Sequence, residues 1–301
     1  MGKKDPIAVA KTQAANVMKT IQGIHIKSVS TVRNYEEALS RVAQYANREL
    51  NIGLREMTPE QAINYLEERG ESVRQKTLDL ERQAIQAMMH FNSKKLDINE
   101  RITPIKSALA TIEKSRSYTA EQVKMIIVSQ QEQNALSTQI AYAAGLRSHE
   151  LFTLLPLGER AADTRKEKEK EAIQHKFSGR IGERYTVQGK GGLCREVEIP
   201  LHLAQQLEAR RLETPKQVND RGVNYTQYYD IRGGRTWSSS FSRLSTRILS
   251  WSSGGHGLRH SYAQERMYEL QNSGMNRQLA LKTVSLELGH FRAGITEVYL
   301  R

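Results

Sequence analysis

Apolar residues in the first hundred positions recur at helical spacing. From Thr31 onward, one helix face is formed by Val32, Tyr35, Leu39, Val42 and Ala46. A second helix is predicted to begin at Thr58, because Thr58 can cap it, Pro59 suits the first turn and Gln61 completes a capping box. A third periodic segment covers residues 78–91. The pattern predicts a small all-helical domain, with residues 1–25 as a loose N-terminal arm.

The pattern changes in the second part of the chain, where short strands join the helices. The boundary is expected within residues 99–117, which gives domains 1–112 and 113–301. Thr119 and Gln122 form another capping box and open a helix through Ile127. A further helix is expected over residues 138–155. Two alternating runs, 185–188 and 195–199, flank a glycine-rich turn and predict a β-hairpin.

The remaining segments are assigned from their composition and spacing. Residues 159–184 are dense in Lys, Arg and Glu and are expected to form a solvated loop or helix. Residues 201–211 are predicted to be helical and residues 214–240 to be a loop. From Phe241 onward the chain is predicted to be helical, with breaks at 254–255, 272–274 and Gly289. The expected fold is mostly α with a small antiparallel β-sheet, in a helical N-terminal domain and a mixed α/β second domain.

The charge balance of the chain favours an anionic partner. Its 301 residues include 45 Lys and Arg against 33 Asp and Glu, a formal net charge of +12. Residues 1–115 carry a net charge of +4 and the remainder +8, so both halves are basic. A basic surface gains from displacing counterions held by phosphates, which makes nucleic acid the first candidate and a membrane surface the second.

Other features of the composition exclude several classes of protein. A single cysteine, Cys194, excludes a disulfide framework and a cysteine-rich zinc site, and it suits a reducing compartment. No apolar run approaches the roughly 20 residues that span a bilayer. The residues after Met1 lack the apolar segment of a signal peptide. We therefore expect a cytoplasmic protein without membrane contact.

Residues suited to phosphodiester chemistry follow one another in the second half. In chain order they are Arg147 with Glu150, Lys190 in the hairpin turn, His256 with Arg259 and His260, His290, and Tyr299. Taken singly, each has an ordinary explanation, such as a surface ion pair, a solvated lysine or a core tyrosine. Together they offer planar guanidinium forks for phosphate oxygens and a histidine one helical turn before an arginine at a helix start.

The order of these motifs resembles the tyrosine recombinase (phage integrase) family, which includes Xer, Cre and lambda integrase. The resemblance covers residues from about 25 to 301, and the motifs of the second half carry it. It implies a site-specific DNA recombinase whose helical core-binding domain and catalytic domain clamp a duplex. It also implies cleavage through a 3′-phosphotyrosyl intermediate and a Holliday junction, in integration, excision or resolution of a mobile element or replicon.

The resemblance implies a role for each motif residue. Tyr299 is the nucleophile, Lys190 protonates the leaving 5′-oxygen, and the phosphate is held by Arg147, His256, Arg259 and His290. Glu150 would position Arg147, and His260 would support the residues that touch the phosphate. Because side chains stabilise the developing charge, the resemblance implies no metal, no ATP and no other cofactor.

The resemblance also implies the partners of the chain. They are double-stranded DNA with a recombination core site, a second copy on each site, a tetramer in synapsis and accessory DNA-bending proteins of a bacterial nucleoid. Family members usually continue past the tyrosine into a segment that docks on a neighbouring protomer. This sequence ends at Arg301, which favours a truncated chain or a different mode of assembly.

Two rival functions stay open from the sequence. A type IB topoisomerase or a telomere resolvase would use the same phosphate chemistry, although the compact length and the Gly289-His290 pair before Tyr299 favour a recombinase. The other rival is a DNA-binding regulator that has lost cleavage. The presence of all six expected catalytic side chains argues against it.

Overall fold

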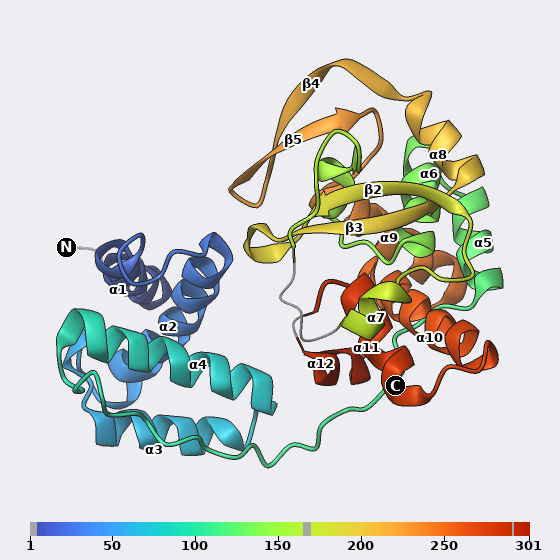
Figure 1. Cartoon of the computed structure of the whole chain (residues 1–301). Coiled ribbons are helices and arrows are strands. Elements are labelled where there is room, and N and C mark those ends of the chain that lie inside the picture. The colour runs from blue at the N-terminus through green and yellow to red at the C-terminus, as the bar shows by residue number, and fades with distance from the viewer. Residues whose placement is uncertain (1–4, 165–169, 291) are drawn as a thin grey trace. The chain divides into compact units, whose positions relative to one another are not determined.

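The chain divides into two compact units, residues 1–112 and 113–301 (Figure 1). The computed structural model describes residues 5–164, 170–290 and 292–301, without the Lys190 side chain. Each unit has its own hydrophobic core. Helices predominate, and the small sheets are antiparallel. Within these residues, no helix combines the length and the apolar character needed to cross a bilayer.

The first unit is a helical bundle. It comprises α1 (Pro6–Ile21), α2 (Val29–Glu49), α3 (Pro59–Gly70) and α4 (Gln75–Met88), with the short turns η1 (Leu54–Glu56) and η2 (Met89–Ser93). The predicted helices are confirmed as α2, α3 and α4, and α3 begins where its capping box predicts. At α3, the Thr58 hydroxyl accepts a hydrogen bond from the backbone N–H of Gln61, whose side chain accepts one from the Thr58 N–H.

Helix α1 shows that the expectation of a loose N-terminal arm was wrong. The segment has its own helix start, because the Asp5 carboxylate accepts a hydrogen bond from the Ile7 N–H and Pro6 occupies the first position. Its buried face consists of Ala10, Ala14, Val17, Met18 and Ile21. This face packs against α2, but its small alanines made the apolar period inconspicuous in the sequence.

The second unit contains a three-stranded antiparallel sheet in the order β1-β2-β3. The strands are β1 (Leu155–Pro156), β2 (Gly182–Gln188) and β3 (Cys194–Pro200). The β2–β3 pair confirms the predicted hairpin, with the turn η5 (Lys190–Gly192) between the strands. The short helix α7 (Lys170–Gln174) lies in the charged segment that leads to β2.

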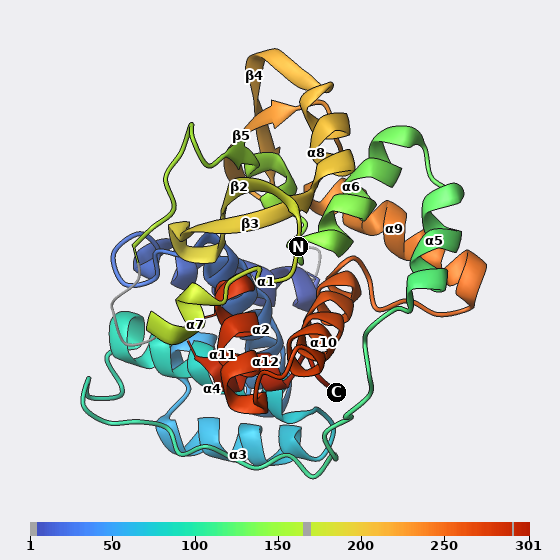
Figure 2. The ribbon, with the colours of Figure 1, turned by 45° about the vertical axis from the view of Figure 1, so that its right-hand side comes forward.

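Helices surround this sheet. The elements α5 (Ala120–Val128), α6 (Glu132–Ala143), α8 (Leu201–Glu208) and α9 (Gly234–Leu249) share one core with the strands. Helices α10 (His256–Asn272), α11 (Arg277–Glu287) and α12 (Ala293–Glu297) lie side by side (Figure 2). The predicted capping box of Thr119 and Gln122 at α5 is confirmed. So are the predicted breaks before α10 and α11 and at Gly289.

The expectation of a helix over residues 138–155 was wrong. Helix α6 ends at Ala143, and the chain then turns at Gly145 with a φ of +60°. A Cβ atom at Gly145 would lie 2.8 Å from the ring of Tyr262, so the turn is set by a distant part of the chain. Arg147 therefore lies in a turn before η3 (Glu150–Thr153), not on a long helix.

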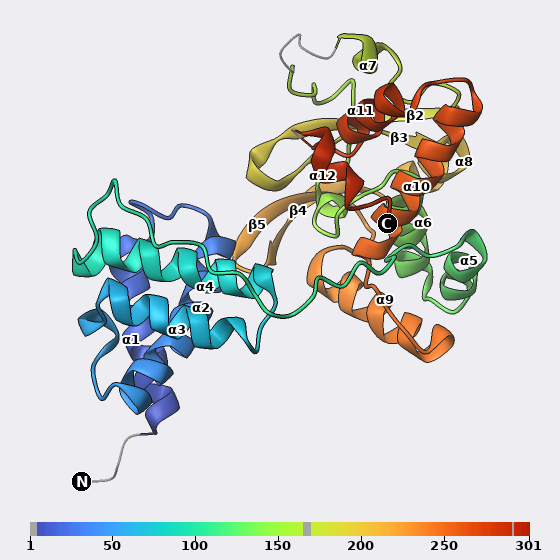
Figure 3. The same cartoon turned by 90° about the horizontal axis from the view of Figure 1, so that it is seen from below.

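The expectation of a loop over residues 214–240 was also wrong. This part of the chain forms a second hairpin, β4 (Arg211–Asp220) with β5 (Val223–Tyr229), and the start of α9 (Figure 3). Arg221 and Gly222 both have positive φ, as the tight turn of a two-residue hairpin requires. On the inner face of this ribbon, the Tyr225 ring lies 5.8 Å from the Phe152 ring in η3.

Candidate active site

The predicted site residues with described side chains come together within the second unit. Arg147 precedes η3, while His256, Arg259 and His260 lie in the first two turns of α10. His290 follows α11, and Tyr299 follows α12. The backbone of Lys190 forms part of the turn η5, and its side chain lies outside the described residues.

Glu150 and Arg147 form a local pair at the edge of the site. The Arg147 Nη1 donates to Glu150 Oε1 at 2.7 Å, and the Arg147 backbone N–H donates to Glu150 Oε2 at 2.8 Å. The Glu150 side chain is completely buried, whereas the Arg147 side chain is 23% exposed. The carboxylate therefore fixes one end of a guanidinium that can still reach an anion from solvent.

Arg259 is the most deeply buried cation of the site. Its Nη1 donates to the carbonyl of Gly145 and its Nη2 to the carbonyl of Leu288. The same Nη2 lies 3.2 Å from Nε2 of His290. Burial, together with the charges of Arg147 and Arg195, lowers the pKa of Arg259 to about 9, so its guanidinium is still charged at neutral pH.

The Tyr299 side chain is surrounded by the histidines and by Arg259. Its hydroxyl lies 3.2 Å from Nε2 of His256. Its ring stacks on the His260 ring at 4.4 Å between centroids, and the His290 ring lies 5.0 Å away. The Arg259 guanidinium is 5.8 Å from the Tyr299 ring centroid. Three of the other five predicted catalytic residues, His256, Arg259 and His290, thus surround the phenol of Tyr299.

The three histidines of the site are neutral at neutral pH. Burial and the neighbouring arginines lower the pKa of His256 and of His290 to about 3. Burial, followed by the charge of Arg116, lowers the pKa of His260 to about 4. A neutral His256 can accept the proton of the Tyr299 hydroxyl, as a general base must. His290 is also oriented by Thr296, whose Oγ1 lies 2.8 Å from its Nδ1.

Stability of the second unit is expected to fall as pH decreases from 6.5 to 5. The folded state keeps these histidines neutral until far below their ordinary pKa of 6.5, whereas the unfolded chain takes up the protons near 6.5. The stabilisation is therefore complete above pH 6.5 and is lost on acidification, by roughly 2 kcal/mol at pH 5 after discounting screening. Urea unfolding followed by tryptophan fluorescence measures it, because Trp237 and Trp251 both lie in this unit. A His256→Asn, His260→Asn variant with an unchanged pH dependence would contradict this account.

Sequence reasoning missed Arg195, which lies beside the predicted residues. Arg195 is 4% exposed on β3, and its Nη2 donates to Oε2 of Glu150 at 2.7 Å. The sequence did contain a signal for this residue, because Arg195 shares the inward face of the predicted strand with Val197 and Ile199. A charged residue at an inward strand position indicates a buried partner.

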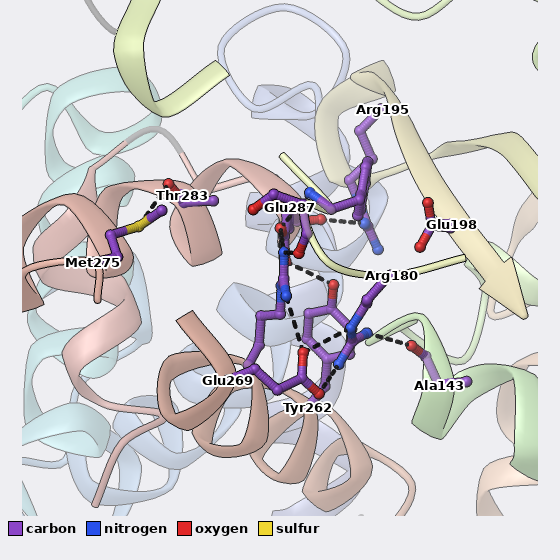
Figure 4. A network of polar contacts seen from close by, with 12 residues as sticks. Ala143, Arg180, Arg195, Glu198, Tyr262, Glu269, Met275, Thr283 and Glu287 are labelled. Atoms are coloured by element: carbon purple, nitrogen blue, oxygen red, sulfur yellow. Dashed lines mark hydrogen bonds and ion pairs between the residues drawn. The ribbon is translucent and has the colours of Figure 1, made fainter. Parts of the chain in front are cut away.

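A buried polar network connects the elements that carry the site (Figure 4). Glu287, at the end of α11, accepts hydrogen bonds from the Tyr262 hydroxyl, the Phe177 N–H and the Arg266 guanidinium. Its backbone carbonyl accepts one from Arg195. The network joins α10, α11, the lead-in to β2 and β3, and so holds the elements that carry the site together.

Comparisons with known proteins identify the fold. No family model matches the chain, and no curated protein matches it in sequence. Solved structures do match, and they show that the chain has the tyrosine recombinase fold. One is the XerH site-specific recombinase bound to palindromic difH substrate, with a TM-score of 0.58, 14% identity, and coverage of 100% of this chain and 94% of that one.

Two further structures with the same fold are integrases. A lambda integrase fragment, recorded as a dimer bound to a COC′ core site, gives a TM-score of 0.58 at 14% identity over 96% of this chain and 94% of that one. A Tn1549 transposon integrase fragment, in complex with transposon right-end DNA, gives a TM-score of 0.57 at 14% identity over 97% of this chain and 94% of that one. The predicted fold class, mostly α with small antiparallel sheets, is confirmed.

Proposed function

We propose that this chain is a site-specific DNA recombinase that cuts and rejoins duplex DNA through Tyr299. The observation that carries the proposal is the contact between the Tyr299 hydroxyl and neutral His256, in a site lined by Arg147 and Arg259. The net charge of +12 suits a DNA partner. The structures of the same fold that are recorded with recombination-site DNA support the same assignment.

In the proposed reaction, the Tyr299 oxygen attacks the phosphorus of one DNA phosphodiester. A bond from phosphorus to the tyrosine oxygen forms, and the bond to the 5′-oxygen of the next nucleotide breaks. The phenol proton passes to His256, and the leaving oxygen takes a proton from Lys190, which is assigned by resemblance. Arg147 and Arg259 stabilise the charge on the non-bridging oxygens.

Rejoining is the reverse of this step in the proposal. The phosphotyrosyl link is itself a phosphodiester, so attack by a free 5′-hydroxyl restores DNA and returns the proton to the tyrosine without ATP. Side-chain cations supply the charge stabilisation, which makes a metal unnecessary for this step.

The biological assignments follow from the same reaction. Exchange of strands between two duplexes requires cleavage of both strands on each, and hence a subunit at each of four phosphates. We therefore propose a dimer on each core site, a tetramer in synapsis and a Holliday junction between the two exchanges. Unit 1–112 is proposed to be the core-binding domain and unit 113–301 the catalytic domain, in a recombinase of a mobile element or replicon.

Trapping the covalent intermediate tests the proposed function. Nicked duplexes that cover the DNA flanking the gene of this protein let the short product diffuse away after cleavage. We expect an adduct that survives denaturant, and mass spectrometry of its digest should place the nucleotide on the peptide that contains Tyr299. Specific binding without an adduct would favour a binding protein, and relaxation of supercoiled plasmid at no particular site would favour a topoisomerase.

A further inference from the structure

Arg195 is a buried arginine of β3 to which the resemblance assigns no role. It lies five residues after Lys190, on the strand that leaves the turn η5. Its side chain is 4% exposed, so its charge must be balanced inside the protein. The groups that balance it all belong to segments that carry residues of the proposed site.

The Arg195 guanidinium connects two of these segments. Its Nη2 donates to Glu150 Oε2 at 2.7 Å and lies 3.4 Å from the carbonyl of Gly145, just before Arg147. Its Nη1 donates to the carbonyl of Glu287 at 2.6 Å, three residues before His290. A Cβ atom at Gly289 would lie 2.6 Å from Cδ of Arg195, so the chain leading to His290 packs directly on the arginine stem.

Glu150 divides its carboxylate between two arginines. Oε1 accepts from Arg147 Nη1, while Oε2 accepts from the Arg147 N–H and from Arg195. Both bonds from Arg147 are local to the turn that carries Glu150, so it is the bond from Arg195 that ties this carboxylate, and Arg147 with it, to β3. Arg259 has a similar pair of partners, because it also donates to the Gly145 carbonyl and to a carbonyl near the end of α11.

We propose that Arg195 is a positioning residue of the strand-transfer site, which fixes Glu150 and through it Arg147, and holds β3 against the segment leading to His290. The inference rests on the proposed function and adds to it a residue that touches neither DNA nor the reacting atoms. Because Arg195 is in β3, it also ties the hairpin that presents Lys190 to the arginines of the site.

The ionisation of Glu150 gives the role a measurable signature. The charged and titratable groups that face it are Arg147, His149, Arg195 and Arg259. Burial raises the pKa of Glu150, but the arginines, with Arg195 the strongest, outweigh burial and hold the pKa well below its ordinary value. Without Arg195 this pKa rises, so we expect Glu150 to take up a proton at a higher pH than in the native chain and then to release Arg147.

The experiment compares Arg195→Met and Arg195→Lys with the control Arg184→Met. Arg184 lies on the neighbouring strand β2 and pairs with Glu196 and Glu198, neither of which is a residue of the proposed site. In single turnover on nicked duplex, we expect Arg195→Met to slow adduct formation by about 10²-fold, because misplaced catalytic groups cost that much. DNA affinity should stay within about threefold, since the duplex keeps its phosphate contacts outside the site of Arg147 and Arg259. Arg195→Lys should recover part of the rate.

The pH profile separates positioning from a merely structural role. Arg195→Met should acquire a loss of rate between pH 7 and 5 that the native chain and Arg184→Met lack, at pH values where tryptophan fluorescence shows all three chains to be folded. Equal rates and equal pH profiles for Arg195→Met and Arg184→Met would overturn the proposal. A rate loss that merely follows the unfolded fraction would overturn it as well.

A second measurement does not depend on cleavage. Inorganic phosphate, followed by calorimetry, probes the anion site formed by Arg147 and Arg259. We expect the phosphate affinity of Arg195→Met to be at least about tenfold below that of Arg184→Met. Equal affinities would overturn the positioning role. If no duplex gives an adduct with the native chain, the proposed function fails, and the phosphate affinities still decide the role of Arg195.

Discussion

Replacement of Tyr299 by Phe is expected to abolish the covalent DNA adduct while leaving the fold and DNA binding intact. The substitution removes one oxygen, whose contact in the structure is with Nε2 of His256. The ring can still stack on His260 and lie beside Arg259, so the packing of the segment is retained. Because a phenyl ring has no nucleophilic atom, the rate of adduct formation should fall by at least about 10⁴-fold.

The measurement combines a denaturing gel with fluorescence anisotropy on the same nicked duplex. The gel reports the adduct, and anisotropy reports a DNA affinity that should change by less than about twofold. Tyr268→Phe is the matched control, because Tyr268 is 69% exposed on α10 and should cleave like the native chain. An adduct that persists in Tyr299→Phe would mean that another side chain attacks, and the assignment of Tyr299 would have to be abandoned.

The parts of the fold that could be predicted from the sequence are those set by neighbouring residues. Thr58 with Gln61 and Thr119 with Gln122 define helix starts, because a capping box needs four consecutive residues and no distant partner. The β2–β3 hairpin was equally accessible, since its alternation and its glycine turn lie within 19 residues, from Gly182 to Pro200.

The parts that could not be predicted depend on distant contacts. The end of α6 is set by Gly145, whose turn is shaped by the ring of Tyr262, more than a hundred residues later. The β4–β5 ribbon was overlooked because polar residues occupy both of its faces: Asn219 and Asn224 pair on one face, and Lys216 lies opposite Gln227 on the other. Polar residues on both faces blur the alternation that identifies a strand.

The candidate site also contains residues that the sequence could predict and residues that it could not. Motif order was enough to select Tyr299, His256 and Arg259, and the structure brings their side chains together. The buried partners Arg195 and Glu287 were not selected, because they come from separate elements and their pairing appears in no local pattern. Residues that are proposed to touch the substrate can thus be selected from motifs, whereas the residues that hold them in place can be found only from the tertiary structure.

The polar network around Glu287 is the part of the second unit where a single substitution should cost most stability. The Glu287 side chain is completely buried and holds Arg266, whose side chain is 1% exposed. Figure 4 shows Glu287 close to Tyr262 and Arg195, with Arg180 and Glu269 continuing the network. Arg266 also donates to Glu269 and to the carbonyl of Ser178. Removing the carboxylate leaves a buried guanidinium without its main counter-charge.

Glu287→Ala is therefore expected to lower the free energy of unfolding of the second unit by about 3–5 kcal/mol, the usual cost of breaking a buried ion pair from one side. Urea unfolding followed by tryptophan fluorescence measures this unit alone, since both tryptophans lie in it. Glu269→Ala is the control, because Glu269 is 43% exposed and its loss should cost about 1 kcal/mol or less. The double variant Glu287→Leu, Arg266→Met removes both charges and should regain much of the lost stability. A double variant as unstable as Glu287→Ala would show that packing, and not the unpaired charge, determines the loss.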